Sequence, residues 1–156
     1  MATVEGLAAL LTRLDRAVEE TLCWFQTWGD APDLRVDQWT PREVLAHLVF
    51  WHQVNLQGMV SAVQGGPPHR LLASSDDLNA RAVARLAGKS SWELATELRA
   101  LHKEVSEAAP SLPSLDVVVR IQLDGTERTA RQQLEGLETH LREHLQELQK
   151  LTSSKA

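Results

Sequence analysis

Histidine is the residue type in this sequence whose number and spacing are best suited to chemistry. There are six histidines, and His140 and His144 stand four residues apart. In a helix this spacing places two imidazoles on one side, one turn apart, where together they can hold a divalent ion. Both lie at the edge of a leucine stripe, beside Leu137 and Leu148. A His-x-x-x-His pair is common, so taken alone it favours a structural or surface role over a metal site.

Two further histidines, His47 and His52, fall in a segment that is apolar over much of a helix circumference. A histidine among apolar residues is more often a hydrogen-bonded core residue than a metal ligand. Periodicity slightly favours His52 as the more central of the two, but it does not decide between them. For His102, beside an apolar helix face, and for His69, in a loop rich in glycine and proline, we expect ordinary structural roles.

The other reactive side chains are few. A single cysteine, Cys23, excludes disulfide scaffolds and cysteine-based zinc modules, so any metal chemistry must rest on histidine and carboxylate. Tyrosine is absent, and no side chain stands out as a catalytic nucleophile. We therefore assign no catalytic residue, and we expect Cys23 to be a small buried apolar side chain.

The net charge of the chain argues against nucleic acid as a binding partner. The chain has 16 Lys+Arg against 21 Asp+Glu, a net charge of −5, so a general attraction to phosphate backbones is not available. Residues 1–11 lack the basic start and long apolar run of a signal peptide, and no later stretch reaches about 18 uninterrupted apolar residues. We expect a cytoplasmic protein that acts on a small molecule and binds neither nucleic acid nor membrane.

The candidate ligands must be positioned by helices, because apolar residues recur at the three- and four-residue steps of a helix face. Thr40 and Glu43 form a capping box at the start of a second helix, and Ser90 and Glu93 form another further along. The predicted helices, four long and one short, span about 4–28, 40–64, 76–87, 90–110 and 129–151.

One segment outside these helices has strand character. Residues 117–123 are mostly β-branched or apolar and precede Asp124-Gly125, which predicts a short extended segment but no convincing sheet. The expected fold is all-α: a four-helix bundle with a short extra helix and one short extended segment before the last helix, in a single domain over 1–156. The second helix has more apolar surface than one neighbouring face covers, which predicts a homodimer.

Several motifs together resemble a known family. They are WTPREVLAHL at 39–48, WH at 51–52, DGT at 124–126 and ETHLREH at 138–144. The combination resembles the DinB-like superfamily of four-helix bundles, which includes bacterial damage-inducible proteins, mycothiol-dependent maleylpyruvate isomerases and bacillithiol transferases. Segments 44–53, 78–79 and 91–105 are similar to the branch that contains colibactin self-protection proteins.

The resemblance implies a set of metal ligands. In this superfamily one histidine from the second helix and two from the last helix bind a divalent metal. By motif position these are His47, His140 and His144, so the resemblance selects His47 over His52. Three neutral imidazoles leave coordination positions open, as in catalytic sites, and nickel, zinc, iron and manganese all accept histidine. A low-molecular-weight thiol is a further cofactor that the resemblance implies.

Two functions are compatible with these observations. The first is a divalent-metal-dependent enzyme that acts on a small reactive molecule by thiol transfer or hydrolysis, in detoxification or stress response. The second is a non-catalytic small-molecule-binding or stress-response protein with a structural or vestigial metal site. Trp51 and Asn55, one and two turns after His47, are candidates for the pocket wall, and we expect Glu143 to face solvent.

Overall fold

The computed structural model describes residues 6–153 and confirms an all-α four-helix bundle with a short extra helix. The predicted start of the first helix at Val4 lies outside the described residues. The elements, in chain order, are α1 Leu7–Trp28, α2 Pro41–Val63, β1 His69–Arg70, α3 Ser75–Arg85, α4 Ser91–Ala108, the 3-10 helix η1 Ala109–Ser111, β2 Val118–Ile121, β3 Glu127–Thr129 and α5 Ala130–Ser153.

Capping side chains determine where α2 and α4 begin. The Thr40 hydroxyl accepts a hydrogen bond from the backbone N–H of Glu43 at 3.2 Å, and the Glu43 carboxylate accepts one from the backbone N–H of Thr40 at 3.0 Å. Ser90 and Glu93 form the same reciprocal pair at the start of α4. Both predicted capping boxes are confirmed, and the first places His47 in the second turn of α2.

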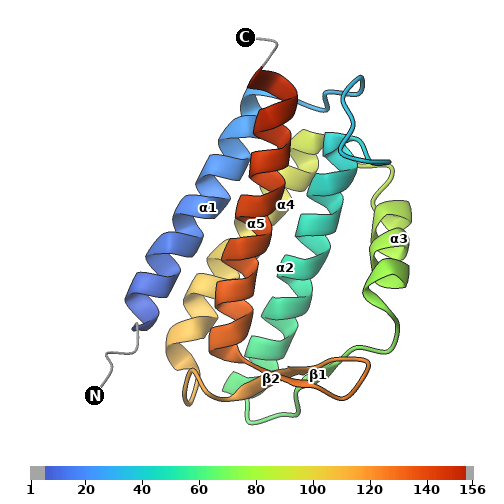
Figure 1. The fold of residues 1–156 in the computed structure, drawn as a ribbon. Coiled ribbons are helices and arrows are strands. Elements are labelled where there is room, and N and C mark those ends of the chain that lie inside the picture. The colour runs from blue at the N-terminus through green and yellow to red at the C-terminus, as the bar shows by residue number, and fades with distance from the viewer. Residues whose placement is uncertain (1–5, 154–156) are drawn as a thin grey trace.

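The four long helices pack side by side, with α1 against α5 and α2 against α4, while α3 lies outside the bundle against α2 (Figure 1). The helices α2 and α5 run in opposite directions, so the first half of α2 lies beside the second half of α5. Each buried leucine contributes roughly 1.5–3 kcal/mol, so the core positions these helices. Its fully buried members include Leu14, Leu45, Leu94, Leu98, Leu134 and Leu141.

A small sheet closes one end of the bundle, where α2 ends and α5 begins (Figure 1). The predicted extended segment is confirmed as β2, which pairs in parallel with β1 and antiparallel with β3. That this segment belongs to a three-stranded sheet was not predicted, because strands of two to four residues are too short to show an alternating pattern. β2 packs on α2 at Gly58, where an added Cβ would clash with the carbonyl oxygen of Val119.

Most of the apolar circumference of α2 is covered within the chain, because α2 contacts α3, α4, α5, β1 and β2, although Val60 and Val63 near its C-terminal end stay exposed. Most of the apolar surface that predicted a homodimer is therefore used internally, and the homodimer stays a prediction. Cys23, expected to be buried, is exposed, because Leu22 and Phe25 take the inward positions of that turn of α1. Within residues 6–153 there is no helix with the length and apolar character needed to span a membrane.

Candidate metal centre

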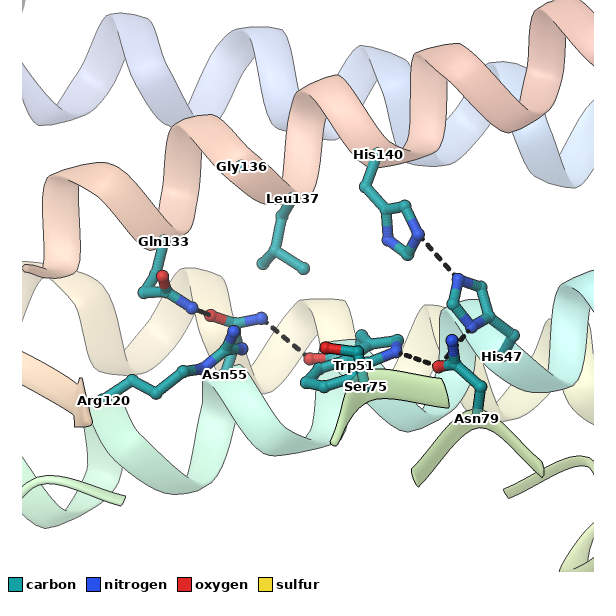
Figure 2. A pocket seen from close by; sticks show the side chains of 10 residues that line it. All are labelled: His47, Trp51, Asn55, Ser75, Asn79, Arg120, Gln133, Gly136, Leu137 and His140. Atoms are coloured by element: carbon teal, nitrogen blue, oxygen red, sulfur yellow. Dashed lines mark hydrogen bonds between the residues drawn. The ribbon is translucent and has the colours of Figure 1, made fainter. Parts of the chain in front are cut away.

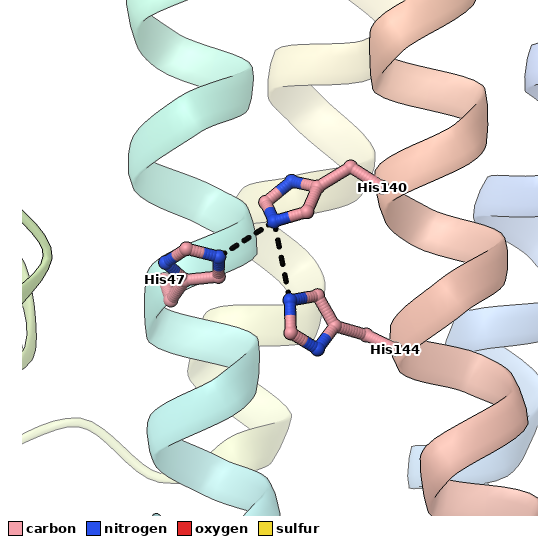
Figure 3. Close-up of side chains that lie close together, drawn as sticks. All are labelled: His47, His140 and His144. Atoms are coloured by element: carbon pink, nitrogen blue, oxygen red, sulfur yellow. Dashed lines mark hydrogen bonds between the residues drawn. The ribbon is translucent and has the colours of Figure 1, made fainter. Parts of the chain in front are cut away.

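Three histidines from two helices converge beside the bundle core. His47 projects from α2, and His140 and His144 project from successive turns of α5 (Figure 3). The Nε2 atom of His140 lies 2.7 Å from Nε2 of His47 and 3.1 Å from Nε2 of His144. One nitrogen from each ring thus points to a common centre, and these ligand atoms all lie within 4.8 Å of one another.

The proton on His47 is placed by Asn79, which comes from α3. The Asn79 side-chain oxygen lies 2.6 Å from the indole nitrogen of Trp51 and 2.8 Å from Nδ1 of His47. An indole N–H can only donate, so the Asn79 atom that faces it must be the carbonyl oxygen. The same oxygen therefore accepts from Nδ1–H of His47, which leaves the lone pair of Nε2 directed at the common centre.

His144 has a neighbouring carboxylate on the side away from the cluster. Its Nδ1 atom lies 2.9 Å from an oxygen of Glu147, one turn further along α5, although the contact lacks the angles of a hydrogen bond. The ring of Trp39 lies against that of His47, with centroids 5.2 Å apart. These contacts restrict the orientations of the two rings.

The electrostatic setting keeps two of the imidazoles neutral near pH 7. Burial, followed by the charge of His144, lowers the pKa of His47 to about 4. Burial also lowers the pKa of His140 to about 3, with further contributions from His47, His144 and Arg120. Neutral imidazole is the form that binds a metal, and a divalent ion accepts a lone pair from each of three such nitrogens. The residues present therefore fit a divalent ion.

His52 belongs to a different cluster. Its side chain is 1% exposed, and its Nε2 atom lies 3.2 Å from Nδ1 of His102 on α4. The other ring nitrogen of His102 contacts the carboxylate of Asp15 on α1. Burial lowers the pKa of His52 to about 3, and the charge of His102 adds to this effect. The geometry thus groups His47, and not His52, with the histidines of α5.

A pocket of about 320 Å³ opens beside His47 and His140, within the size range of small-molecule sites (Figure 2). Trp51 and Asn55 line it, as predicted, and Glu143 is exposed, also as predicted. The remaining lining residues come from three elements: Ser75 and Asn79 from α3, Arg120 from β2, and Gln133, Gly136 and Leu137 from α5.

Three residues of this site were not identified as functional from the sequence alone. Asn79 belongs to the segment 78–79 that carries part of the family resemblance, but the sequence assigns it no role, because that role depends on where α3 docks. Arg120 is a lone charge within an apolar, β-branched strand, and Gln133 is a polar residue on the leucine face of α5. Arg120 and Gln133 each interrupt an apolar pattern, and this interruption is the signal that could have identified them.

Comparisons with solved structures show the same fold at low sequence identity. A crystal structure of an uncharacterized protein from Clostridium difficile 630 has a TM-score of 0.78 and 16% identity, over 97% of this chain and 98% of that one. A structure titled sibling lethal factor precursor, DfsB, has a TM-score of 0.76 and 15% identity, over 98% of each chain.

A third similar structure is that of a mycothiol-dependent maleylpyruvate isomerase. Its TM-score is 0.75 at 14% identity, and the match covers 92% of this chain but only 61% of the isomerase. No curated protein matches the sequence significantly. The DinB superfamily model matches residues 2–148, which is nearly the whole sequence. The chain therefore belongs to the DinB superfamily.

Proposed function

We propose that this protein is a divalent-metal-dependent enzyme that acts on a small reactive molecule by thiol transfer or hydrolysis, as a detoxification or stress-response activity. One observation carries the proposal: imidazole nitrogens of His47, His140 and His144 converge at the edge of a ligand-sized pocket. The structurally similar isomerase is described as mycothiol-dependent, which supports a low-molecular-weight thiol as the second cofactor.

The chain's own residues hold and orient the reacting groups. His47, His140 and His144 would hold the ion, and Asn79 keeps the proton of His47 on the nitrogen that faces away from it. A divalent ion held by these three imidazoles would supply Lewis acidity, the chemistry that polarises a substrate oxygen or lowers the pKa of water or a thiol. Trp51 forms part of the pocket wall between Arg120 and the histidine cluster (Figure 2).

The nucleophile in this proposal comes from outside the chain. The pocket lining contains no aspartate, glutamate, cysteine or lysine, and Ser75 has no base among the lining residues other than the proposed metal ligands. A thiol or a water molecule is therefore the group that attacks the substrate. An ion held by three protein ligands would match the ligand number of catalytic and not of structural zinc sites.

Metal binding is the first test. Untagged protein is stripped with a chelator, reloaded separately with nickel, zinc, iron or manganese, and analysed for metal content by mass spectrometry. We expect one ion per chain, and loss of that ion in His47→Ala, His140→Ala and His144→Ala. The control is His69→Ala, since His69 lies on β1 outside the cluster. A protein that takes up no divalent ion, or triad variants that bind it normally, would contradict the proposal.

Turnover is the second test, because a structural ion would also pass the first. The loaded protein is mixed with an electrophilic substrate, with and without a low-molecular-weight thiol, and product is measured over many enzyme equivalents. We expect multiple turnovers that disappear in His140→Ala, and dependence on the thiol distinguishes transfer from hydrolysis.

A non-catalytic small-molecule-binding protein is the second candidate function. It is favoured by the absence among the lining residues of a carboxylate base that could activate the Ser75 hydroxyl or a water molecule. This alternative predicts stoichiometric binding of the substrate class without product release. Metal-dependent multiple turnover would exclude it.

A further inference from the structure

Arg120 is a partly buried cation in the wall of the pocket, and it has no acidic partner among the residues that the structure describes. Its guanidinium carbon lies 5.1 Å from the centre of a Trp51 ring, within cation–π distance. Among residues 6–153, no carboxylate lies within ion-pair distance of Arg120. Burial lowers its pKa to about 10, with a contribution from Arg128, so it remains charged near pH 7.

The neighbouring amide of Gln133 does not compensate this charge. With its oxygen turned to Arg120, Gln133 accepts hydrogen bonds from Nη2 at 2.8 Å and from Nε at 3.1 Å. With its nitrogen in that position, it instead donates to the side-chain oxygen of Asn55 at 2.7 Å. One neutral amide cannot serve both neighbours, and a guanidinium has five N–H donors and a full positive charge. Burial of such a charge is costly unless an anion pairs with it.

The pocket differs in charge from the chain that forms it. The sequence has more acidic than basic residues, 21 against 16, yet none of the pocket-lining residues is acidic. The charged groups of the lining are Arg120 and whatever ion the histidines hold. An anion is therefore the charge class that this pocket accepts, whereas a cationic ligand would find no compensating group among the lining side chains.

The two ends of the pocket are separated along the helices. Gln133 and Arg120 lie at one end and His140 and His47 at the other, with Trp51 and Leu137 between them (Figure 2). Gln133 precedes His140 by seven residues of α5, which corresponds to about 10 Å along the helix axis. A ligand whose anionic group contacts Arg120 thus extends past an apolar middle region toward the histidine cluster.

We propose that Arg120 binds the carboxylate of the substrate, which is a small organic acid whose reacting atom is separated from that carboxylate by a short apolar body. The proposal deepens the function proposed above and rests on it for the reaction at the histidine end. A planar guanidinium pairs with a planar carboxylate through two parallel hydrogen bonds, which gives orientation as well as affinity. In this arrangement Trp51 supports Arg120 from one face and contacts the apolar body of the ligand.

The test compares two probes of matched shape that differ in charge. Hexanoate and hexanamide are titrated calorimetrically into zinc-loaded protein, and metal content is measured for every sample. We expect hexanoate to bind at least tenfold more tightly than hexanamide. Arg120→Gln should remove this difference, whereas Arg120→Lys should retain part of it. The matched control is Arg128→Gln, which removes a charge from the paired strand at a residue outside the pocket lining and should preserve the preference.

The outcomes separate this inference from the proposed function. A hexanoate preference that persists in Arg120→Gln, or that depends on zinc and not on Arg120, would overturn it, because the carboxylate would then be a metal ligand. A failure of hexanoate to bind the unaltered protein at millimolar concentration would also overturn it. If pentylphosphonate binds more tightly than hexanoate, the assignment of a carboxylate is overturned, and Arg120 instead binds a phosphate-type group. If the protein binds no metal but keeps an Arg120-dependent preference, the acid site stands and the metal-dependent function fails.

Discussion

A single amide oxygen organises the proton arrangement around His47. Asn79 accepts hydrogen bonds from both Trp51 and His47, and these three residues come from two helices. Its contact with Trp51 fixes which end of the amide faces His47, and its contact with His47 fixes which ring nitrogen carries the proton. The lone pair at the histidine cluster thus depends on a residue that contributes no atom to it.

Substitution of Asn79 should change metal affinity through His47. We expect Asn79→Ala to weaken metal binding by about 10- to 100-fold, the usual effect of losing a partner that orients a ligand histidine. Asn79→Asp keeps an acceptor in place and should retain most of the affinity. Competition with a chromogenic chelator measures both variants. Equal losses in the two would mean that Asn79 acts only through the docking of α3.

The lowered histidine pKa values predict how the metal-free fold responds to acid. An unfolded histidine titrates near 6.5, whereas the pKa is about 4 for buried His47 and about 3 for buried His140. Between these values the unfolded chain binds more protons than the folded chain, so the free energy of unfolding falls as pH falls from about 6.5 toward 4. Each histidine can lower the free energy of unfolding by at most about 1.4 kcal/mol for each pH unit.

Urea denaturation of chelator-stripped protein at pH 7.5, 6 and 5 measures this effect. We expect a progressive loss of stability, and a shallower loss in His47→Gln, which has one fewer histidine to protonate. A midpoint that does not change over this range would show that the two rings are not held in the neutral state by burial.

Sequence reasoning identified the histidine cluster only in part. The spacing of His140 and His144 indicates that they share a helix face, but periodicity slightly favours His52 over His47. Both α2 histidines are buried, and they face different helices: His52 faces His102 on α4, and His47 faces α5. Only the positions of the neighbouring helices, or the family motif, distinguish them, because an apolar helix carries no marker for which neighbour lies on which side.

At the scale of the elements, the helices and the extended segment that forms β2 were predictable, whereas β1, β3 and their pairing with β2 were not. Capping boxes and leucine stripes are local patterns, and they locate α2, α4 and α5 within a few residues. The strands β1 and β3 have two and three residues, and each is a strand only because it pairs with β2. The position of Arg120 in the pocket depends on that pairing and on the contact of β2 with α2, so it could not be read from its own segment.

Two helical glycines provide a matched pair of substitutions. At Gly58, an added methyl would clash with the Val119 carbonyl and displace β2 next to Arg120. At Gly136, no heavy atom lies within 4 Å of the added methyl. We expect Gly58→Ala to lower the melting temperature and weaken hexanoate binding. Gly136→Ala should raise stability by roughly 0.5–1 kcal/mol, the usual gain from alanine within a helix.

Thermal unfolding of the two alanine variants checks this prediction. Destabilisation by Gly136→Ala, or an unchanged melting temperature in Gly58→Ala, would contradict it. Because Gly136 also lines the pocket, its added methyl should reduce the binding of bulky ligands more than that of small ones.

At the scale of the whole molecule, the bundle contains two histidine clusters on different sides of α2. The first joins α2 to α5, and the second links His52 on α2 to His102 on α4 and, through it, to Asp15 on α1. None of the residues of the second cluster lines the pocket beside His47, and this cluster contributes to packing, whereas the first opens to that pocket. The overall bundle could be predicted from the sequence, but this division of roles depends on how the helices pack.

We propose that the chain forms a homodimer in solution. Since most of α2 is covered internally, pairing would rely on the exposed apolar side chains of the surface, of which Leu72 and Trp92 are the most exposed, at 84% and 75%. Light scattering at micromolar concentration should give about twice 17.4 kDa. A mass equal to that of one chain would show that the exposed apolar residues are isolated surface positions.

The small sheet at the end of the bundle places the residue proposed to select the ligand apart from the histidine cluster. Arg120 sits on a hairpin, β2 and β3, whereas the clustered histidines sit on the long helices α2 and α5. The part that selects the ligand by charge and the part that would carry the reaction are therefore separate segments of chain. Exchange of residues 118–129 between bundles of similar dimensions would transfer acid preference without touching the ion's ligands, which makes the hairpin a natural unit for recombination and for redesign.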